Sequence, residues 1–268
     1  MKKILFTVLF IGWAGTRVLH AQYDVNQLTV LYERSLEVRA YTDRLMLDWI
    51  LKEQAINPVD TRKKWKADRQ HFLALLDTIS NKVPPQSDEL VKQAEKLRRK
   101  SEVWMQWLIN TGSNKSSQVK QLAKWYKITV DAEEQFIRTL QKYLGMDEQT
   151  LSHIDNALRF YSDAQRAFGS YLLQHKAYRS AFVSKGFAEG NGSDLFDKAM
   201  SRVKKLFEVY GKDPGMRRQL KSLYADLVFF KQAVDRRYDP RVFYTSFDKF
   251  NRKFERFVQD LFKNNKWI

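Results

Sequence analysis

Residues 239–261 read DPRVFYTSFDKFNRKFERFVQDL, and this stretch decides the class of fold. Its apolar residues recur every three or four positions, which places them along one face of an α-helix. That stripe consists of Phe243, Phe247, Phe250, Phe254, Phe257 and Leu261. Asp239 is a favoured residue just before a helix, and Pro240 suits the first helical position. We therefore predict a helix that begins near residue 240 and carries a phenylalanine stripe.

The same pattern recurs along the chain. We predict helices over about residues 24–56, 58–83, 88–111, 118–144, 147–184 and 194–210, and two more that begin at 214 and 240. In the third of these the seam residues are spaced alternately by four and three, as in a coiled coil. No stretch alternates persistently between apolar and polar residues as a half-buried strand does. The sequence predicts an all-α protein, an antiparallel multi-helix bundle of about eight helices.

Gly145 lies at the end of the fourth predicted helix, near the middle of the chain, where a glycine commonly ends a helix. A hinge there would divide the chain into two four-helix halves, residues 22–145 and residues 146–268. One continuous domain is the alternative, because 268 residues can form a single core.

The first 21 residues have the parts of a secretory signal peptide. Lys2 and Lys3 precede an apolar run over residues 4–14, and a short polar stretch ends in Ala21. The run is shorter than the roughly 20 residues that span a bilayer. We predict a signal peptide over residues 1–21 and a periplasmic or secreted protein. Cleavage after Ala14 and an uncleaved anchor are the alternatives.

The chain is strongly basic and has no cysteine. It carries 47 Lys and Arg against 31 Asp and Glu, a formal charge of +16. Removal of residues 1–21 would leave 44 basic side chains and a charge of +13. Such a charge favours anionic surfaces or an acidic protein partner, and export makes nucleic acid the less expected partner. The alternative is that the lysines only keep the bundle soluble. Without cysteine, disulfides and thiolate metal sites are excluded.

Residue types that carry catalysis are scarce. The four histidines lie at positions 20, 71, 153 and 175, and no two have the i,i+4 spacing of a helical zinc site. Asp131, Glu133 and Glu134 lie close together, but neighbouring positions on a helix point in different directions, so we interpret them as a solvated face. We expect no enzyme activity, no cofactor and no metal.

A candidate pocket lies on the fifth predicted helix. Gln165, His175 and Arg179 continue its apolar seam and could line a polar cavity between helices. The alternative is that the helix leaves the core at these positions.

A candidate interaction surface is formed by aromatic and basic residues that we expect to be exposed. It consists of Trp107, Lys249, Arg252, Lys253, Arg256 and Trp267. A basic amphipathic helix such as residues 240–261 can bind a membrane surface or a partner groove. The alternative is that the phenylalanine stripe simply packs on the rest of the bundle.

Together these observations predict an exported, non-enzymatic helical protein of a bacterial cell envelope that binds a protein partner or an anionic envelope component. A component of a secretion or conjugation assembly has the same gross profile. The alternative function is a periplasmic protein that binds a small molecule or lipid in a pocket between helices.

Overall fold

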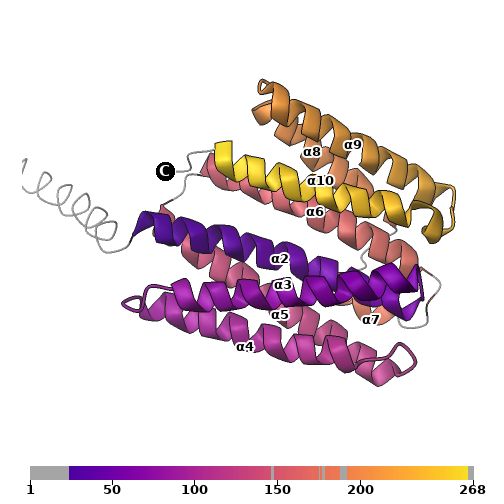
Figure 1. Ribbon diagram of the computed structural model, residues 1–268, viewed down its shortest axis with the longest axis horizontal. Helices are drawn as coiled ribbons and strands as arrows, with labels where there is room; N and C mark the ends of the chain where they lie inside the picture. The colour runs from indigo at the N-terminus through magenta and orange to yellow at the C-terminus, as the bar shows by residue number, and fades with distance from the viewer. Residues whose placement is uncertain (1–23, 146–147, 175, 177–178, 188–191, 265–268) are drawn as a thin grey trace, which may run out of the picture.

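The computed structural model describes residues 24–145, 148–174, 176, 179–187 and 192–264. All regular secondary structure in these ranges is helical, which confirms the all-α class (Figure 1). The helices are α2 (Val25–Glu53), α3 (Pro58–Lys82), α4 (Asp88–Asn110), α5 (Ser116–Leu144), α6 (Glu148–Leu173), α7 (Arg179–Val183), α8 (Gly192–Tyr210), α9 (Pro214–Asp235) and α10 (Pro240–Asn264).

The single helix predicted over residues 147–184 is wrong in its last third. The α6 helix ends at Leu173, and a separate short helix, α7, follows and packs on α5. The last carbonyl groups of a helix have no partner within it, and Gln54 of the α2–α3 connection donates its side-chain Nε2 to the Leu172 carbonyl at 2.8 Å. The break lets Phe182 of α7 reach the core beside Trp49, with ring centroids 5.9 Å apart.

Two helices occupy the centre of the bundle. The α2 helix packs against α3, α5 and α6, while α6 packs against α2, α8 and α10. In Figure 1, α3, α4 and α5 lie on one side of this pair and α8 and α9 on the other, with α10 alongside α6. Within the described residues, each helix from α2 to α10 contributes buried apolar side chains to one cluster. Whether residues 22–145 and 146–268 form separate domains stays a prediction.

The phenylalanine stripe of α10 is buried within the bundle. Phe254 stacks on Tyr161 of α6 with ring centroids 4.0 Å apart. Phe247 lies 4.5 Å from Phe168 of α6 and 5.0 Å from Phe230 of α9, again between centroids. The stripe therefore packs α10 onto α6 and α9, and these aromatic contacts add to the free energy of burial. The side chain of Phe243 lies outside the described residues.

The positions where several helices begin or end are explained by single residues at those boundaries. The Ser87 hydroxyl accepts a hydrogen bond from the backbone N–H of Leu90 at 3.3 Å, as expected for an N-cap. Gly145 has a φ of 59°, the left-handed conformation that ends α5. Asn57, which precedes α3, is of a residue type that commonly caps helices, but it adopts a φ of 45° and its side chain makes no capping hydrogen bond. Its amide instead donates to the Asp60 carboxylate at 3.0 Å.

Removing the cap of α9 should have a measurable cost. The Asp213 carboxylate accepts hydrogen bonds from the N–H groups of Gly215 at 2.7 Å and Met216 at 2.9 Å. We expect Asp213→Ala to lower the free energy of unfolding by about 1 kcal/mol, because two N–H groups lose their acceptor. Urea denaturation measures this change. Asp213→Asn, which keeps a capping oxygen, is the control and should lose only a few tenths of that value; equal losses would contradict the capping role.

Residues 1–23 lie outside the described residues, so the signal peptide over residues 1–21 stays a prediction. Among the helices that the structure does describe, none combines the length and the apolarity that a membrane span requires.

Candidate anion-binding pocket

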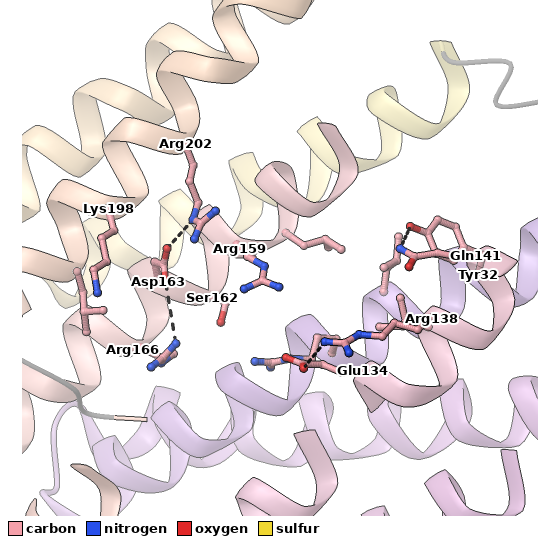
Figure 2. Close-up of a pocket in the computed structure, with 15 residues that line it drawn as sticks. Tyr32, Glu134, Arg138, Gln141, Arg159, Ser162, Asp163, Arg166, Lys198 and Arg202 are labelled. Atoms are coloured by element: carbon pink, nitrogen blue, oxygen red, sulfur yellow. Dashed lines mark hydrogen bonds and ion pairs between the residues drawn. The ribbon is translucent and has the colours of Figure 1, made fainter. Parts of the chain in front are cut away.

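A cavity of about 350 Å³ lies between α2, α5, α6 and α8 (Figure 2). Each helix contributes side chains spaced by three or four residues, which puts them on one helical face. The lining residues are Tyr32, Leu36 and Arg39 of α2; Glu134, Ile137, Arg138 and Gln141 of α5; Leu158, Arg159, Ser162, Asp163 and Arg166 of α6; and Leu195, Lys198 and Arg202 of α8. The cavity is thus built by four helices that are distant in the sequence.

Positive charge dominates the lining of this cavity. Six of its side chains are basic and two are acidic, a formal excess of four positive charges. The basic residues are Arg39, Arg138, Arg159, Arg166, Lys198 and Arg202. We call them the basic lining. Such a group of cations in one concave space raises the local concentration of anions.

The two acidic side chains of the lining are already engaged. Asp163 accepts a hydrogen bond from Arg202 Nε at 2.8 Å, and its other oxygen lies 3.9 Å from Arg166 Nη1. Glu134 Oε2 lies 3.7 Å from Arg138 Nη2. Figure 2 shows Arg159 in the space between these two groups. The acids therefore orient individual arginines and leave the excess positive charge in place.

A buried polar network fixes the floor of the cavity. Arg39 Nη1 lies 2.9 Å from Asp43 Oδ2, one turn further along α2, and Asp43 is fully buried. The hydroxyl groups of Tyr126 and Ser162 both donate to the same carboxylate. Burial lowers the pKa of Arg39, but the negative charges around it, Asp43 foremost, outweigh burial and raise the pKa above its ordinary value. Arg39 and Ser162 thus line the cavity in fixed orientations.

Glu133 extends the network, and here the sequence-based interpretation is wrong. Asp131 is exposed as expected, but Glu133 is only 1% exposed. It accepts a hydrogen bond from Thr42, and its Oε2 lies 3.8 Å from Arg39 Nε. Burial raises the pKa of Glu133 to about 8, although the Arg39 charge and the Thr42 hydrogen bond oppose the shift. At neutral pH this carboxyl group is mostly protonated, so it does not cancel the Arg39 charge.

Two residues of the candidate pocket predicted from sequence, Gln165 and Arg179, are described by the structure, and neither lines the cationic cavity. Gln165 is fully buried and donates its amide to Asn251 Oδ1 of α10 at 2.6 Å, so it belongs to the α6–α10 contact and does not line the cationic cavity. Arg179 is in α7, a separate helix. His175 lies outside the described residues. A pocket formed by these three residues stays a prediction.

The structure describes five of the six residues of the candidate interaction surface. Lys249, Arg252 and Arg256 are exposed on α10, while Lys253 is half-buried and binds Asp226 of α9 at 2.6 Å. Trp107 is half-buried against the core. Trp267 lies outside the described residues. The structure therefore leaves a basic face on α10, and its role as an interaction surface stays a prediction.

The chemistry of the cavity suits an anion. Guanidinium groups bind phosphate, sulfate and carboxylate through paired, charge-assisted hydrogen bonds. Within the described residues, no cluster of three or more His, Asp or Glu side chains is placed to hold a metal ion. The arrangement can therefore bind and orient an anionic group, with the Tyr32 hydroxyl, which accepts a hydrogen bond from Gln141 at 3.0 Å, beside the cations.

Comparison with protein-family models, with curated proteins and with solved structures finds no match for this chain. The cavity is therefore the feature from which a function can be inferred. Its signal in the sequence is the spacing of Arg159 and Arg166, two turns apart on α6, and of Lys198 and Arg202, one turn apart on α8. Each pair alone resembles an ordinary solvated helix face.

Proposed function

We propose that this chain is a non-enzymatic binding protein that takes a small anionic ligand into the cavity lined by Arg39, Arg138, Arg159, Arg166, Lys198 and Arg202. The ligand carries a phosphate, sulfate or carboxylate group. The observation that carries this proposal is the excess of four positive charges around one cavity of about 350 Å³. Cavities of this size between helices commonly hold small ligands.

The buried network supports binding rather than a purely structural role for the arginines. The buried Asp43 carboxylate lies 2.9 Å from the Arg39 guanidinium, so this group is oriented before a ligand arrives. A cation that is already ordered loses little side-chain entropy when it binds. Because Glu133 is mostly protonated at neutral pH, the network adds one negative charge, that of Asp43, and the region stays positive.

The proposed place of action is outside the cytoplasm, and its support is the composition of residues 1–21. A ligand of the bacterial cell envelope would fit this location. N-terminal sequencing of the protein isolated from its natural source tests the export step: a chain that begins at Gln22 or Gly15 supports it, and a chain that retains residues 1–21 in the cytoplasm contradicts it.

The binding proposal is tested by removing two cations from the cavity. Arg159 and Lys198 are both exposed, so Arg159→Gln with Lys198→Gln should leave the fold intact. We expect this double variant to bind ethyl phosphate or sulfate about 10–100-fold more weakly than the natural chain, because charged hydrogen bonds are lost. Isothermal titration calorimetry at fixed salt concentration measures the change.

A matched control removes the same charge from another surface. Lys249→Gln with Arg256→Gln takes two exposed cations from α10 and lowers the net charge equally. Its affinity for the small anion should equal that of the natural chain. If both double variants lose affinity to the same extent, binding depends on net charge and the pocket is not the site.

The control variant also tests a second candidate function, favoured by the exposed Lys249, Arg252 and Arg256 of α10. On this alternative, the basic face of α10 binds an acidic protein partner or an anionic surface. The α10 double variant would then lose binding to anionic lipid vesicles or to the partner, while the double variant in the cavity would keep it.

A further inference from the structure

A second cavity, of about 310 Å³, lies beside the cationic one. It is formed by α2, α3, α6 and α10. Most of its lining is apolar or aromatic, and these residues are Leu36, Ala40, Tyr41, Leu158, Tyr161, Phe254 and Val258. The stacked pair Tyr161 and Phe254 forms one wall. The first cavity thus attracts negative charge, while the second offers apolar contacts to a hydrocarbon chain.

The charged residues of the second cavity are paired with opposite charges. Arg34 donates to Glu37 at 2.8 Å, and Glu255 accepts a hydrogen bond from Arg44. His71 packs its ring against Tyr41, with centroids 4.6 Å apart. The lining carries Arg34, Glu37 and Glu255, a formal excess of one negative charge that Arg44 offsets from outside the cavity, so nothing in it would draw an anion, in contrast to the basic lining of the first cavity.

The two cavities share a wall made by two leucines. Leu36 of α2 and Leu158 of α6 line both of them. Leu36 is buried and Leu158 is half-buried. A leucine side chain can change rotamer without movement of the backbone. A ligand that passes from one cavity into the other would meet these two aliphatic side chains, which are favourable contacts for a hydrocarbon chain.

We infer that the ligand is an anionic amphiphile: its acidic head group occupies the basic lining, and its hydrocarbon chain passes Leu36 and Leu158 into the aromatic cavity. This inference rests on the proposed function and specifies the class of ligand. Cation-lined and hydrocarbon-lined spaces that share a wall match the two ends of one such molecule, and neither space alone suits both ends.

The test compares a series of n-alkyl phosphates, from ethyl to octyl, at concentrations where they are monomeric. Calorimetry of the full-length protein gives the dissociation constant of each. We expect affinity to increase by up to about fourfold per added methylene group, which amounts to about 4,000-fold over the six methylenes that separate ethyl from octyl phosphate. Octanol, which has the chain without the acidic head, should bind far more weakly than octyl phosphate.

Variants that fill the second cavity sharpen the test. Ala40 and Val258 line only that cavity and are half-buried, so Ala40→Leu adds volume there without touching the basic lining. We expect Ala40→Leu to bind ethyl phosphate as the natural chain does and to lose about tenfold or more in affinity for octyl phosphate. Val258→Phe gives an independent variant if Ala40→Leu is unstable. Ala67→Leu, on an exposed face of α3, is the matched control.

Three outcomes overturn the inference, and they are distinguishable. If ethyl phosphate binds but longer chains add nothing, the amphiphile is excluded and the anion-binding function stands. If neither ethyl nor octyl phosphate binds, the proposed function falls and the inference falls with it. If octanol binds as tightly as octyl phosphate, the head group has no role and the assignment of the two ends is wrong.

Discussion

Replacing Asp43 with asparagine is expected to lower the free energy of unfolding by about 3–5 kcal/mol. Asp43 is fully buried and lies 2.9 Å from Arg39 Nη1, and it accepts hydrogen bonds from Tyr126 and Ser162. In the variant, the Arg39 guanidinium stays in the interior without its nearest counter-charge. The large cost comes from that unpaired charge and exceeds what the loss of neutral hydrogen bonds would give.

Urea denaturation at pH 7 measures this loss, and a second substitution identifies its cause. Ser162→Ala removes one hydroxyl donor and leaves the Arg39–Asp43 pair intact, so we expect it to cost about 1 kcal/mol. Combining Arg39→Met with Asp43→Asn should restore part of the stability that Asp43→Asn loses, because no unpaired cation remains. A loss below about 1 kcal/mol in Asp43→Asn would contradict the buried ion pair.

Some features of the fold can be predicted from the local sequence, and others cannot. Ser87 and Asp213 bond to N–H groups two or three residues away, so these helix starts follow from a few neighbouring residues. The stripe of α10 follows from spacing along one helix. The break between α6 and α7 does not, because it depends on Gln54, which is 118 residues away in sequence from the carbonyl it contacts.

The pocket depends on long-range packing even more strongly. Arg39 and Glu133 are on different helices, and the 3.8 Å approach of their atoms depends on which face of α5 meets α2. Glu133 lies between exposed Asp131 and half-exposed Glu134, so its neighbours in sequence suggest a solvated face. Neighbouring positions on a helix differ by about 100° in direction, and only the packing partner shows which acid is buried.

The titration of Glu133 gives the second large effect, a fall in stability as the pH rises. Burial raises the pKa of Glu133 to about 8 in the folded protein, against an ordinary value of 4.5. Between these pH values the folded state keeps a proton that the unfolded state has lost. The contribution of this retained proton to the free energy of unfolding is fully present below pH 4.5 and is lost as the pH rises through 8. Between these values the free energy of unfolding falls by up to about 1.4 kcal/mol per pH unit.

The Glu133→Gln variant should remove this dependence. The Thr42 hydroxyl lies within hydrogen-bonding distance of both Glu133 and the Val38 carbonyl, and its single hydrogen can serve only one of them. A protonated Glu133 keeps an oxygen that accepts this hydrogen, as its carboxyl group does in the structure. The amide oxygen of a glutamine can accept it in the same way, so the network is kept while the titrating group is lost.

We therefore expect Glu133→Gln to match the natural chain near pH 5 and to be more stable by several kcal/mol near pH 8. Urea denaturation across this pH range measures both curves. Glu134→Gln, one residue away and half-exposed, is the control and should follow the natural curve. Parallel curves for Glu133→Gln and the natural chain would mean that Glu133 is ionised when folded, and the positive charge available to an anion would then be smaller by one.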